Sequence, residues 1–178
     1  MDYYKQKQII ARVDKKGEII GKIEKWEAHK KGILHKAFTV ALVYKDKFVL
    51  QHRKHPAFDG VYDLTISSHQ LYLNNNLENT FDATYKTLKR EWDLEKKDIL
   101  SLKLEGAVYY KARDTKSEFI EHEYCEILTV KVKKLPPPVF DYAYGYSLIT
   151  KKELLNKKSR IYPLLAPWVL KMIEKNLI

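Results

Sequence analysis

The sequence predicts an α+β fold in which a mixed sheet packs against helices. Three observations favour it: strand-like segments come first, one amphipathic helical segment interrupts them, and further strands precede helices near the C-terminal end. The 178 residues contain no internal repeat, low-complexity segment or flexible linker. We therefore expect a single domain over residues 1–178, long enough to bury roughly 70% of its unfolded surface.

The first strands are expected where apolar and β-branched residues gather between turn residues. A turn at Lys45 and Asp46 is expected to join two of these strands as a hairpin. The predicted strands are Ile19 to Ile23, Ala37 to Tyr44, Lys47 to Gln51 and Tyr62 to Ser67.

An amphipathic helix is expected over residues 77–93, directly after the turn-rich Asn74 to Asn76. Its apolar stripe includes Leu77, Leu88 and Trp92, which recur at helical spacing. Glu91 lies at the margin of this stripe, where a carboxylate suits either a hard cation or a salt bridge with a nearby lysine.

The C-terminal half is expected to return to strands and then to helices. Strands are predicted near 99–111 and 119–133, followed by a stiff connection at Pro136 to Pro138. Thr150 and Glu153 form a capping box that predicts a short helix. A final helix is expected to begin between Pro163 and Pro167.

The formal net charge of +10 comes mainly from lysine, since only 5 of the 33 basic residues are arginines. Proteins that recognise nucleic-acid bases favour arginine side chains for these contacts. We therefore expect a solvated lysine-coated surface and no nucleic-acid partner. The charge should still draw small anions toward a cleft.

The single cysteine, Cys125, excludes an internal disulfide and fits a reducing compartment, so a cytoplasmic location is expected. No apolar run approaches the roughly 20 residues that span a bilayer, and no signal peptide is expected. A monomer or a homodimer is expected.

The strand near residues 119–128 carries an unusual acidic face. Side chains alternate along a strand, so Glu121, Glu123 and Cys125 share one face. Adjacent carboxylates repel unless a cation or a proton relieves them. A metal site with histidine and oxygen ligands is one explanation, and a solvated charged face is the other. His52 and His55, in a basic loop, are expected to be surface residues.

Several short motifs then occur in one order along the chain: EKWEAH, GILHKAF, LQHR, GVYD, SSH, EHEYCE and APW. This order resembles type I isopentenyl-diphosphate isomerase, a branch of the Nudix superfamily. The likeness runs from about Gly17 to Trp168. It implies a Nudix-type α/β/α sandwich and a small-molecule diphosphate substrate.

The resemblance implies roles for particular residues. A mononuclear site for Mn²⁺ or Zn²⁺ would use three histidines and two glutamates, and Mg²⁺ bound with the diphosphate would be held by Glu91. Tyr110 would work beside Glu123 in proton transfer, and Trp168 would lie near the hydrocarbon. Basic residues would grip the diphosphate, including Arg53 as an exposed cleft residue. The implied metal ligands are His29, His35, His69, Glu121 and Glu123, and the implied diphosphate ligands include Lys25, Arg53, Lys54 and Lys86.

The chain departs from the family pattern at several positions. Ser67 stands where the family has its catalytic cysteine, and Thr87 stands where it has a diphosphate-binding arginine. The loop after Arg53 is short, which leaves Lys54 as a replacement for a second lysine. The segment Gln70 to Asn76 is longer and richer in asparagine. Of the Nudix box, only Glu91 remains.

Three functions remain open from the sequence. The first is a slow or altered isomerase, in which Ser67 and Glu123 face the substrate and Ser67 is a poor proton carrier. The second is a hydrolase of nucleoside or prenyl diphosphates. The third is a protein that binds metal and diphosphate without catalysis.

Overall fold

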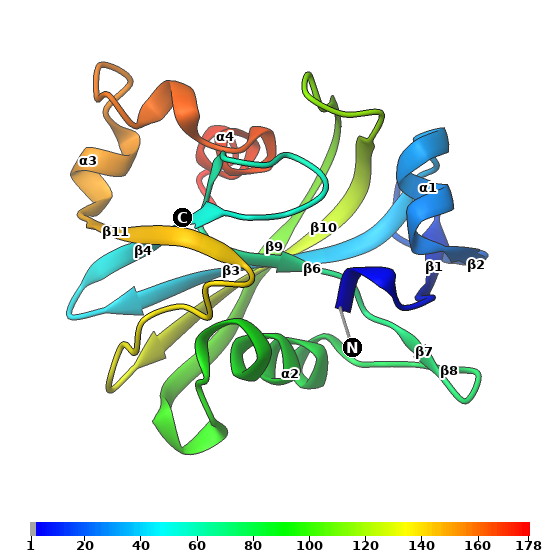
Figure 1. The fold of residues 1–178 in the computed structure, drawn as a ribbon, viewed down its shortest axis with the longest axis horizontal. Coiled ribbons are helices and arrows are strands. Elements are labelled where there is room, and N and C mark those ends of the chain that lie inside the picture. Colours follow the sequence, from blue (N-terminus) through cyan, green and yellow to red (C-terminus); the bar gives the residue numbers. More distant parts are fainter. Residues whose placement is uncertain (1–2) are drawn as a thin grey trace.

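A twisted mixed sheet lies between helices in the computed structural model, which describes residues 3–178 (Figure 1). Nine of the strands within these residues form this sheet, and β7 and β8 form a separate hairpin. The strands are β1 (Ile9–Val13), β2 (Ile19–Glu24), β3 (His35–Tyr44), β4 (Lys47–Arg53), β5 (Tyr62–Asp63), β6 (Thr65–Ser68), β7 (Tyr72–Leu73), β8 (Asn76–Leu77), β9 (Ile99–Arg113), β10 (Ile120–Val132) and β11 (Ala143–Ile149).

Helices cover both faces of the sheet (Figure 1). Short 3-10 helices lie at Tyr3–Lys5 (η1), Lys96–Asp98 (η2) and Tyr162–Leu164 (η3). The α-helices are α1 (Lys25–Lys31), α2 (Thr80–Trp92), α3 (Lys151–Leu155) and α4 (Pro167–Glu174). The α+β mixed-sheet prediction is confirmed.

Strand β3 is the centre of the sheet. Along one edge it pairs in parallel with β10, from His35 opposite Glu123 to Val43 opposite Lys131. Its other edge is shared in turn by β1, β6 and β4, all antiparallel. Strand β9 then pairs with the outer edge of β10. Four strands, β10, β1, β6 and β4, therefore pair directly with β3, and β9 is attached to it through β10.

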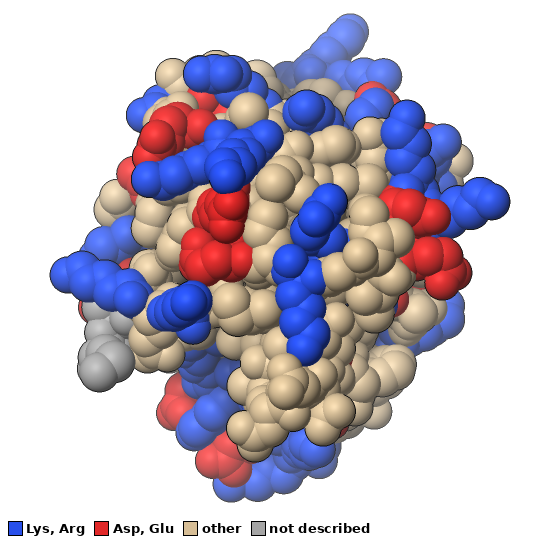
Figure 2. All heavy atoms as spheres, turned by 90° about the vertical axis from the view of Figure 1, so that its right-hand side faces the viewer, with Lys and Arg blue, Asp and Glu red and all other residues tan. Residues whose placement is uncertain are grey.

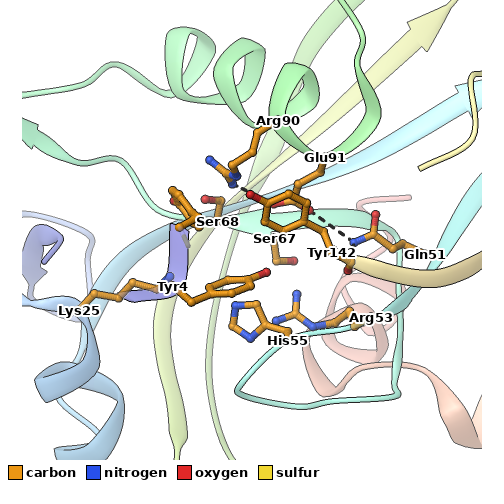
Figure 3. A pocket seen from close by; sticks show the side chains of 11 residues that line it. Tyr4, Lys25, Gln51, Arg53, His55, Ser67, Ser68, Arg90, Glu91 and Tyr142 are labelled. Carbon is orange, nitrogen blue, oxygen red and sulfur yellow. Dashed lines mark hydrogen bonds and ion pairs between the residues drawn. The ribbon is translucent and has the colours of Figure 1, made fainter. Parts of the chain in front are cut away.

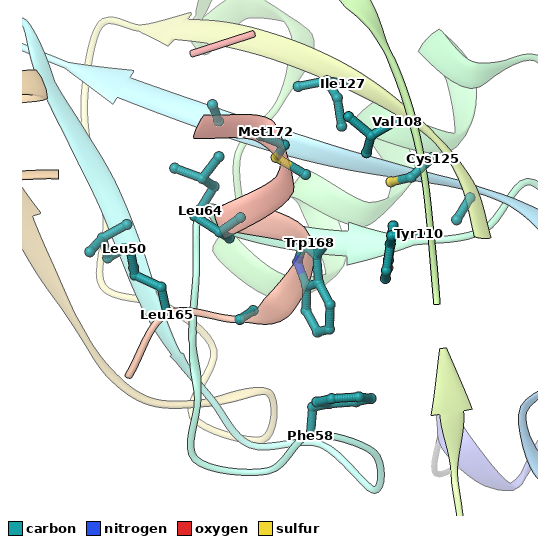
Figure 4. Packing of buried hydrophobic residues seen from close by; sticks show 14 of the residues in the cluster. Leu50, Phe58, Leu64, Val108, Tyr110, Cys125, Ile127, Leu165, Trp168 and Met172 are labelled. Atoms are coloured by element: carbon teal, nitrogen blue, oxygen red, sulfur yellow. The ribbon is translucent and has the colours of Figure 1, made fainter. Parts of the chain in front are cut away.

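Two hydrophobic cores secure the helices to the sheet. On one face Trp168 and Met172 of α4 pack with Leu50 and Ile127 (Figure 4). On the other face Trp92 of α2 lies in a cluster with Phe38 and Leu128. Full burial of one such side chain contributes about 1.5–3 kcal/mol, so both helices are fixed against the strands that carry polar residues.

Most predicted elements are observed, with shifted boundaries. Helix α2 begins at Thr80, where the Asn79 side chain accepts a hydrogen bond from the Asp82 amide, and Leu77 lies in β8 instead. Lys45 and Asp46 both have positive φ, which suits a two-residue hairpin turn. The capping box of Thr150 and Glu153 is present at α3.

Several elements differ from the expectations. The predicted strand from Tyr62 to Ser67 is divided at Leu64 into β5 and β6, and β1 and β11 were not predicted. Helix α1 was also not predicted; it ends at Lys31, because Gly32 takes the left-handed conformation with a φ of 60°.

The surface agrees with a solvated, lysine-coated protein. Figure 2 shows lysine and arginine side chains scattered over one face, separated by uncharged residues and by acidic groups. Within residues 3–178, no helix combines the length and apolar character needed to cross a membrane.

Candidate metal centre and anion pocket

Strand pairing sets the first row of the candidate metal centre. Glu123 on β10 lies opposite His35 on β3 and opposite Tyr110 on β9. Paired side chains on neighbouring strands point to the same face. The register therefore places an imidazole, a carboxylate and a phenol side by side on one face of the sheet.

Three further residues reach the same point from separate elements. Glu121 lies two residues before Glu123, hence on the same face of β10. His29 comes from the last turn of α1, and His69 directly follows β6. The structure thus brings His29, His35, His69, Glu121 and Glu123 together, with one nitrogen or oxygen atom of each within 4.8 Å of those of the others.

The contacts inside this group pair ring nitrogens with carboxylate oxygens. His29 Nε2 lies 3.2 Å from Glu121 Oε2, and the Nε2 atoms of His69 and His35 lie 3.2 and 3.5 Å from Glu123 Oε1. All five residues are buried, His69 being the most exposed at 9%. Buried carboxylates at this spacing require positive charge nearby.

The Nδ1 atoms of His29 and His35 indicate how these two rings are oriented toward the carboxylates. His29 Nδ1 lies 2.6 Å from the Lys25 carbonyl oxygen, and His35 Nδ1 lies 2.7 Å from the Ile33 carbonyl oxygen. A carbonyl only accepts, so each Nδ1 carries a proton and each Nε2 faces the carboxylates. A divalent cation would fit between the Nε2 atoms and the carboxylates, and backbone acceptors orient metal-binding histidines in this way.

The pKa values reflect the closeness of the rings and the carboxylates. Burial acts to lower the pKa of His29, but Glu121 and the Lys25 carbonyl raise it above its usual value. Burial and the neighbouring His35 and His29 hold the pKa of His69 well below its usual range, so its ring is neutral. Burial would raise the pKa of Glu123, but its contacts with His35 and Tyr110 lower it to about 2. Tyr110 donates its hydroxyl proton to Glu123 Oε2. A divalent cation could replace the proton shared between His29 and Glu121, and a donor set of three imidazoles and two carboxylates suits Zn²⁺ or Mn²⁺.

A basic pocket lies next to the metal centre (Figure 3). Lys25 enters it from the start of α1, Arg53 from the end of β4, and Arg90 and Glu91 from α2. Its remaining walls are Tyr3, Tyr4, Gln51, His55, Ser67, Ser68 and Tyr142. We call this the anion pocket.

Arg53 is not the exposed cleft residue that was expected. It is 4% exposed and forms an ion pair at 3.0 Å with the buried Asp63. Asp63 also accepts a hydrogen bond of 2.8 Å from the Trp168 indole. Removing one partner of a buried ion pair costs about 3–5 kcal/mol. Charge reversal at Arg53 would therefore damage the fold as well as the pocket.

Lys25 is a buried cation held among aromatic rings. Its ammonium lies 4.6 Å from the centre of the Trp26 ring, and the Tyr3 and Tyr4 rings lie somewhat further away. Burial lowers the pKa of Lys25 to about 8, despite the attraction of Glu121. A charge desolvated in this way gains strongly from an anionic ligand.

Arg90 is a pocket residue that the sequence analysis missed. Its guanidinium lies 2.8 Å from Glu91 Oε1 and 3.8 Å from the centre of the Tyr3 ring. Thr87 lies three residues earlier on α2, hence about one turn away on the same side. Searching one helical turn around Thr87 for a displaced arginine could have found it.

Glu91 is buried at 6% exposure, and its partner is Arg90 and not the lysine that was considered. The Gln51 amide lies 3.4 Å from its other oxygen, and Gln51 is itself held by the Trp92 indole at 2.8 Å. His55 is likewise not the surface residue expected, because it lines both the anion pocket and the metal-centre cavity.

Two lysines considered as diphosphate ligands lie outside the anion pocket. Lys54 is exposed and donates to the Phe140 carbonyl oxygen at 3.1 Å. Lys86 is exposed on α2 and forms an ion pair with Glu78. Arg90 takes the place on α2 where Lys86 was considered.

Ser67 lines the metal-centre cavity as well as the anion pocket. Its hydroxyl lies 2.7 Å from the Thr39 hydroxyl, which in turn lies 3.4 Å from the Cys125 sulfur. Cys125 is fully buried, and burial raises the pKa of its thiol. The thiol is thus separated from the cavities by Thr39 and Ser67.

The sequence matches no protein-family model and no curated protein. Many solved structures resemble the chain in fold, and three of them illustrate the likeness. DR0079 from Deinococcus radiodurans has a TM-score of 0.68 at 12% identity, over 94% of this chain and 98% of its own. A Nudix hydrolase from Nitrosomonas europaea has a TM-score of 0.52 at 16% identity, over 79% and 88% of the two chains.

The third structure is the Nudix domain of Shewanella oneidensis NrtR complexed with ADP ribose. It has a TM-score of 0.50 at 12% identity, over 80% of this chain and 84% of its own. The protein therefore has the Nudix fold. Likeness at this level of identity shows the fold alone and does not single out the isopentenyl-diphosphate isomerase branch. Within this fold the chain carries a buried His/Glu cluster that could hold a metal.

Divalent metal is expected to stabilise the protein through this cluster. At a free metal concentration of about 100 times Kd, binding adds about 2.7 kcal/mol and should raise Tm by roughly 5–10 °C. Glu121→Gln keeps the side-chain shape but removes one ligand charge, so most of the shift should disappear. Differential scanning calorimetry with Mn²⁺ or Zn²⁺, against chelator, measures it.

His122→Asn is the matched control, because His122 lies on the same strand but faces away, with Nδ1 near the Gly32 carbonyl oxygen. Each variant is compared with its own Tm in chelator. Equal metal-induced shifts in Glu121→Gln and His122→Asn would show that the cluster is not the metal site.

Proposed function

We propose that the protein is a metal-dependent hydrolase of small organic diphosphates. One observation carries this proposal: the anion pocket and the metal-centre cavity have a common wall. Both are lined by Lys25, Arg53, His55, Ser67 and Ser68. A diphosphate held in the pocket would therefore lie directly beside the His/Glu cluster.

The charges of the anion pocket suit a diphosphate. Lys25 and Arg90 offer cations whose present partners are mainly aromatic rings and Glu91. Arg53 adds a guanidinium fixed by Asp63. Charge-assisted hydrogen bonds to phosphate oxygens are about twice as strong as neutral ones. Glu91 would hold Mg²⁺ against the diphosphate, with Arg90 moved toward the phosphates.

The His/Glu cluster supplies the second half of the proposed site. A divalent metal bound there acts as a Lewis acid and lowers the pKa of bound water. The residues around it would position and accept protons: Glu121 Oε2 is buried 3.2 Å from His29 Nε2, and Tyr110 fixes the orientation of Glu123 through a hydrogen bond. In the reaction a water oxygen would bond to phosphorus and give up a proton to Glu121, the bridging P–O bond would break, and the leaving phosphate would take both electrons of that bond.

The comparisons support a diphosphate ligand at the level of fold. Nudix hydrolases and a Nudix domain that binds ADP ribose are among the similar structures. The Nudix box itself is reduced to Glu91. The proposed chemistry therefore relies on the His/Glu cluster instead of a row of helix carboxylates.

Isomerisation of an isoprenoid diphosphate is the second candidate, favoured by the Tyr110–Glu123 hydrogen bond. This pair could exchange a proton with carbon, while the Trp168 ring forms another wall of the same cavity. The opposite proton carrier would be Ser67, and a hydroxyl is a poor acid or base near neutral pH. We therefore place isomerisation second.

Replacing Lys25 by methionine tests the anion pocket. The variant should keep its fold, since burying an ammonium is costly and methionine has a similar length. Affinity for Mg²⁺–pyrophosphate should fall about 10- to 100-fold, because hydrogen bonds to charged groups contribute about 1.5–3 kcal/mol. Isothermal titration calorimetry measures it. Lys54→Met, at an exposed position outside the pocket, serves as the control, and equal affinity in both variants would contradict the assignment.

The reaction can be assigned with isopentenyl diphosphate in deuterated water, using protein loaded with Mn²⁺ and Mg²⁺. We expect release of phosphate and no deuterium on carbon. Carbon-bound deuterium without phosphate release would establish the isomerase instead. Neither product, from protein that binds pyrophosphate, would indicate a binding protein without catalysis.

Ser67→Cys tests the second candidate separately. A thiol has an unperturbed pKa of about 8.5, far nearer neutrality than that of a hydroxyl, so any isomerase activity should rise by at least about tenfold. NMR of the deuterated product measures it. A folded, metal-loaded Ser67→Cys protein without a gain removes latent isomerase chemistry. Ser67→Ala controls for loss of the hydroxyl.

A further inference from the structure

A third cavity lies beside the two already described, and neither of the candidate sites accounts for it. It has a volume of about 220 Å³ and lies between η1, the β7–β8 hairpin and α2. Leu71, Leu73, Ala83 and the Tyr3 ring form its apolar walls. We call this the hairpin cavity.

The hairpin cavity adjoins both candidate sites. Arg90 and Tyr3 line it as well as the anion pocket, and His69 lines it as well as the metal-centre cavity. Arg90 and Tyr3, whose guanidinium and ring centre lie 3.8 Å apart, therefore stand between the two spaces, and a diphosphate that draws Arg90 toward its phosphates would open a path into the hairpin cavity.

The volumes differ by an order of magnitude. The metal-centre cavity has about 20 Å³ and the anion pocket about 10 Å³ of accessible space, against about 220 Å³ in the hairpin cavity. An apolar cavity of roughly 150 Å³ accepts a benzene molecule, whereas roughly 10–15 Å³ holds one water. Among these three spaces, only the hairpin cavity has room for an organic group.

Two polar residues of the hairpin cavity, Glu78 and Lys86, are engaged with each other. Glu78 forms an ion pair with Lys86, and its second oxygen accepts the Leu71 amide at 3.0 Å. Neither residue is left to read the edge of a nucleobase. Thr87 and the shared Arg90 and His69 are its other polar wall residues, and the remaining walls are aliphatic or aromatic, which favours an apolar group.

The hairpin that forms one wall is well defined. Asn74 and Asn75 both have positive φ, which suits the two-residue turn between β7 and β8. The Asn75 side chain accepts a hydrogen bond of 3.0 Å from Lys22 on β2. The asparagine-rich segment is thus an ordered wall beside the site.

We propose that the hairpin cavity, and not the space beside Trp168, receives the organic group of the diphosphate. That group is apolar, and Leu73 and Ala83 determine which groups are accepted. This inference rests on the proposed function, because it needs a diphosphate in the anion pocket. It adds where the organic group binds and what kind of group it is.

Three probe ligands distinguish a failure of the proposed function from a failure of the apolar assignment alone. Calorimetric titrations with Mg²⁺ use pyrophosphate, geranyl diphosphate and ADP as probes. We expect geranyl diphosphate to bind at least about tenfold more tightly than pyrophosphate and more tightly than ADP, since apolar contacts distinguish ligands by about 10- to 200-fold. No binding of any probe would overturn the proposed function, and this inference with it. Tighter binding of ADP would overturn the apolar assignment alone.

Two variants locate the organic group. Leu73→Asp places a charge on the cavity wall, and Ala83→Met fills the cavity from α2. Either should reduce the preference for geranyl diphosphate over pyrophosphate by about tenfold or more. Leu104→Asp is the matched control, because Leu104 on β9 is 45% exposed and Leu73 is 47% exposed.

The ratio of the two affinities is the measurement, so a general loss of stability does not imitate the effect. An unchanged ratio in Leu73→Asp and Ala83→Met, with pyrophosphate still bound, would overturn the inference. An equal change in Leu104→Asp would do the same.

Discussion

The parallel pairing of β10 with β3 is the constraint on which the candidate site depends. It runs over nine residue pairs and begins with Glu123 opposite His35. A shift of one residue would turn every side chain of β10 to the other face. Glu121 and Glu123 would then leave the histidines, and His122 would take their place. The hydrophobic core opposes such a shift, because Cys125, Ile127 and Val130 would move with the strand.

The two candidate sites are coupled through the elements that carry them. Helix α1 provides Lys25 at its first turn and His29 at its last, and the Lys25 carbonyl holds the His29 ring. Strand β6 provides Ser67, which lies between the two candidate sites, and His69 directly follows this strand. Binding of an anion in the pocket would thus act on residues that lie one or two positions, or one helical turn, along the chain from the ligands of the metal centre. This proximity suits a reaction in which both groups act on one substrate.

Strand content, the long helix and the capping box were predictable because they follow from local periodicity and turn chemistry. The acidic face of β10 was also predictable, since alternation alone places Glu121 with Glu123. Convergence with His29, His35 and His69 did not follow from local patterns, because it depends on pairings between residues about 30 to 90 positions apart; it was expected only from the family resemblance of the ordered motifs. Arg90, Tyr3 and Tyr4 were missed for the same reason. Their position in the pocket follows from how η1 and α2 meet over the sheet, for which no local pattern exists. Arg53 shows the opposite error, since its sequence motif indicated an anion ligand but gave no sign of the buried ion pair with Asp63.

The single cysteine, Cys125, is a chemical probe of how the folded molecule opens. Cys125 is fully buried at the centre of the sheet, behind the hydroxyls of Thr39 and Ser67. A reagent that alkylates thiols can reach it only when β10 separates from β3 or when α4 lifts from the sheet. Its alkylation rate in native buffer therefore reports the free energy of that opening, because slow labelling means that the open form is rarely populated. The same burial protects this thiol, the single one in the sequence, from oxidants.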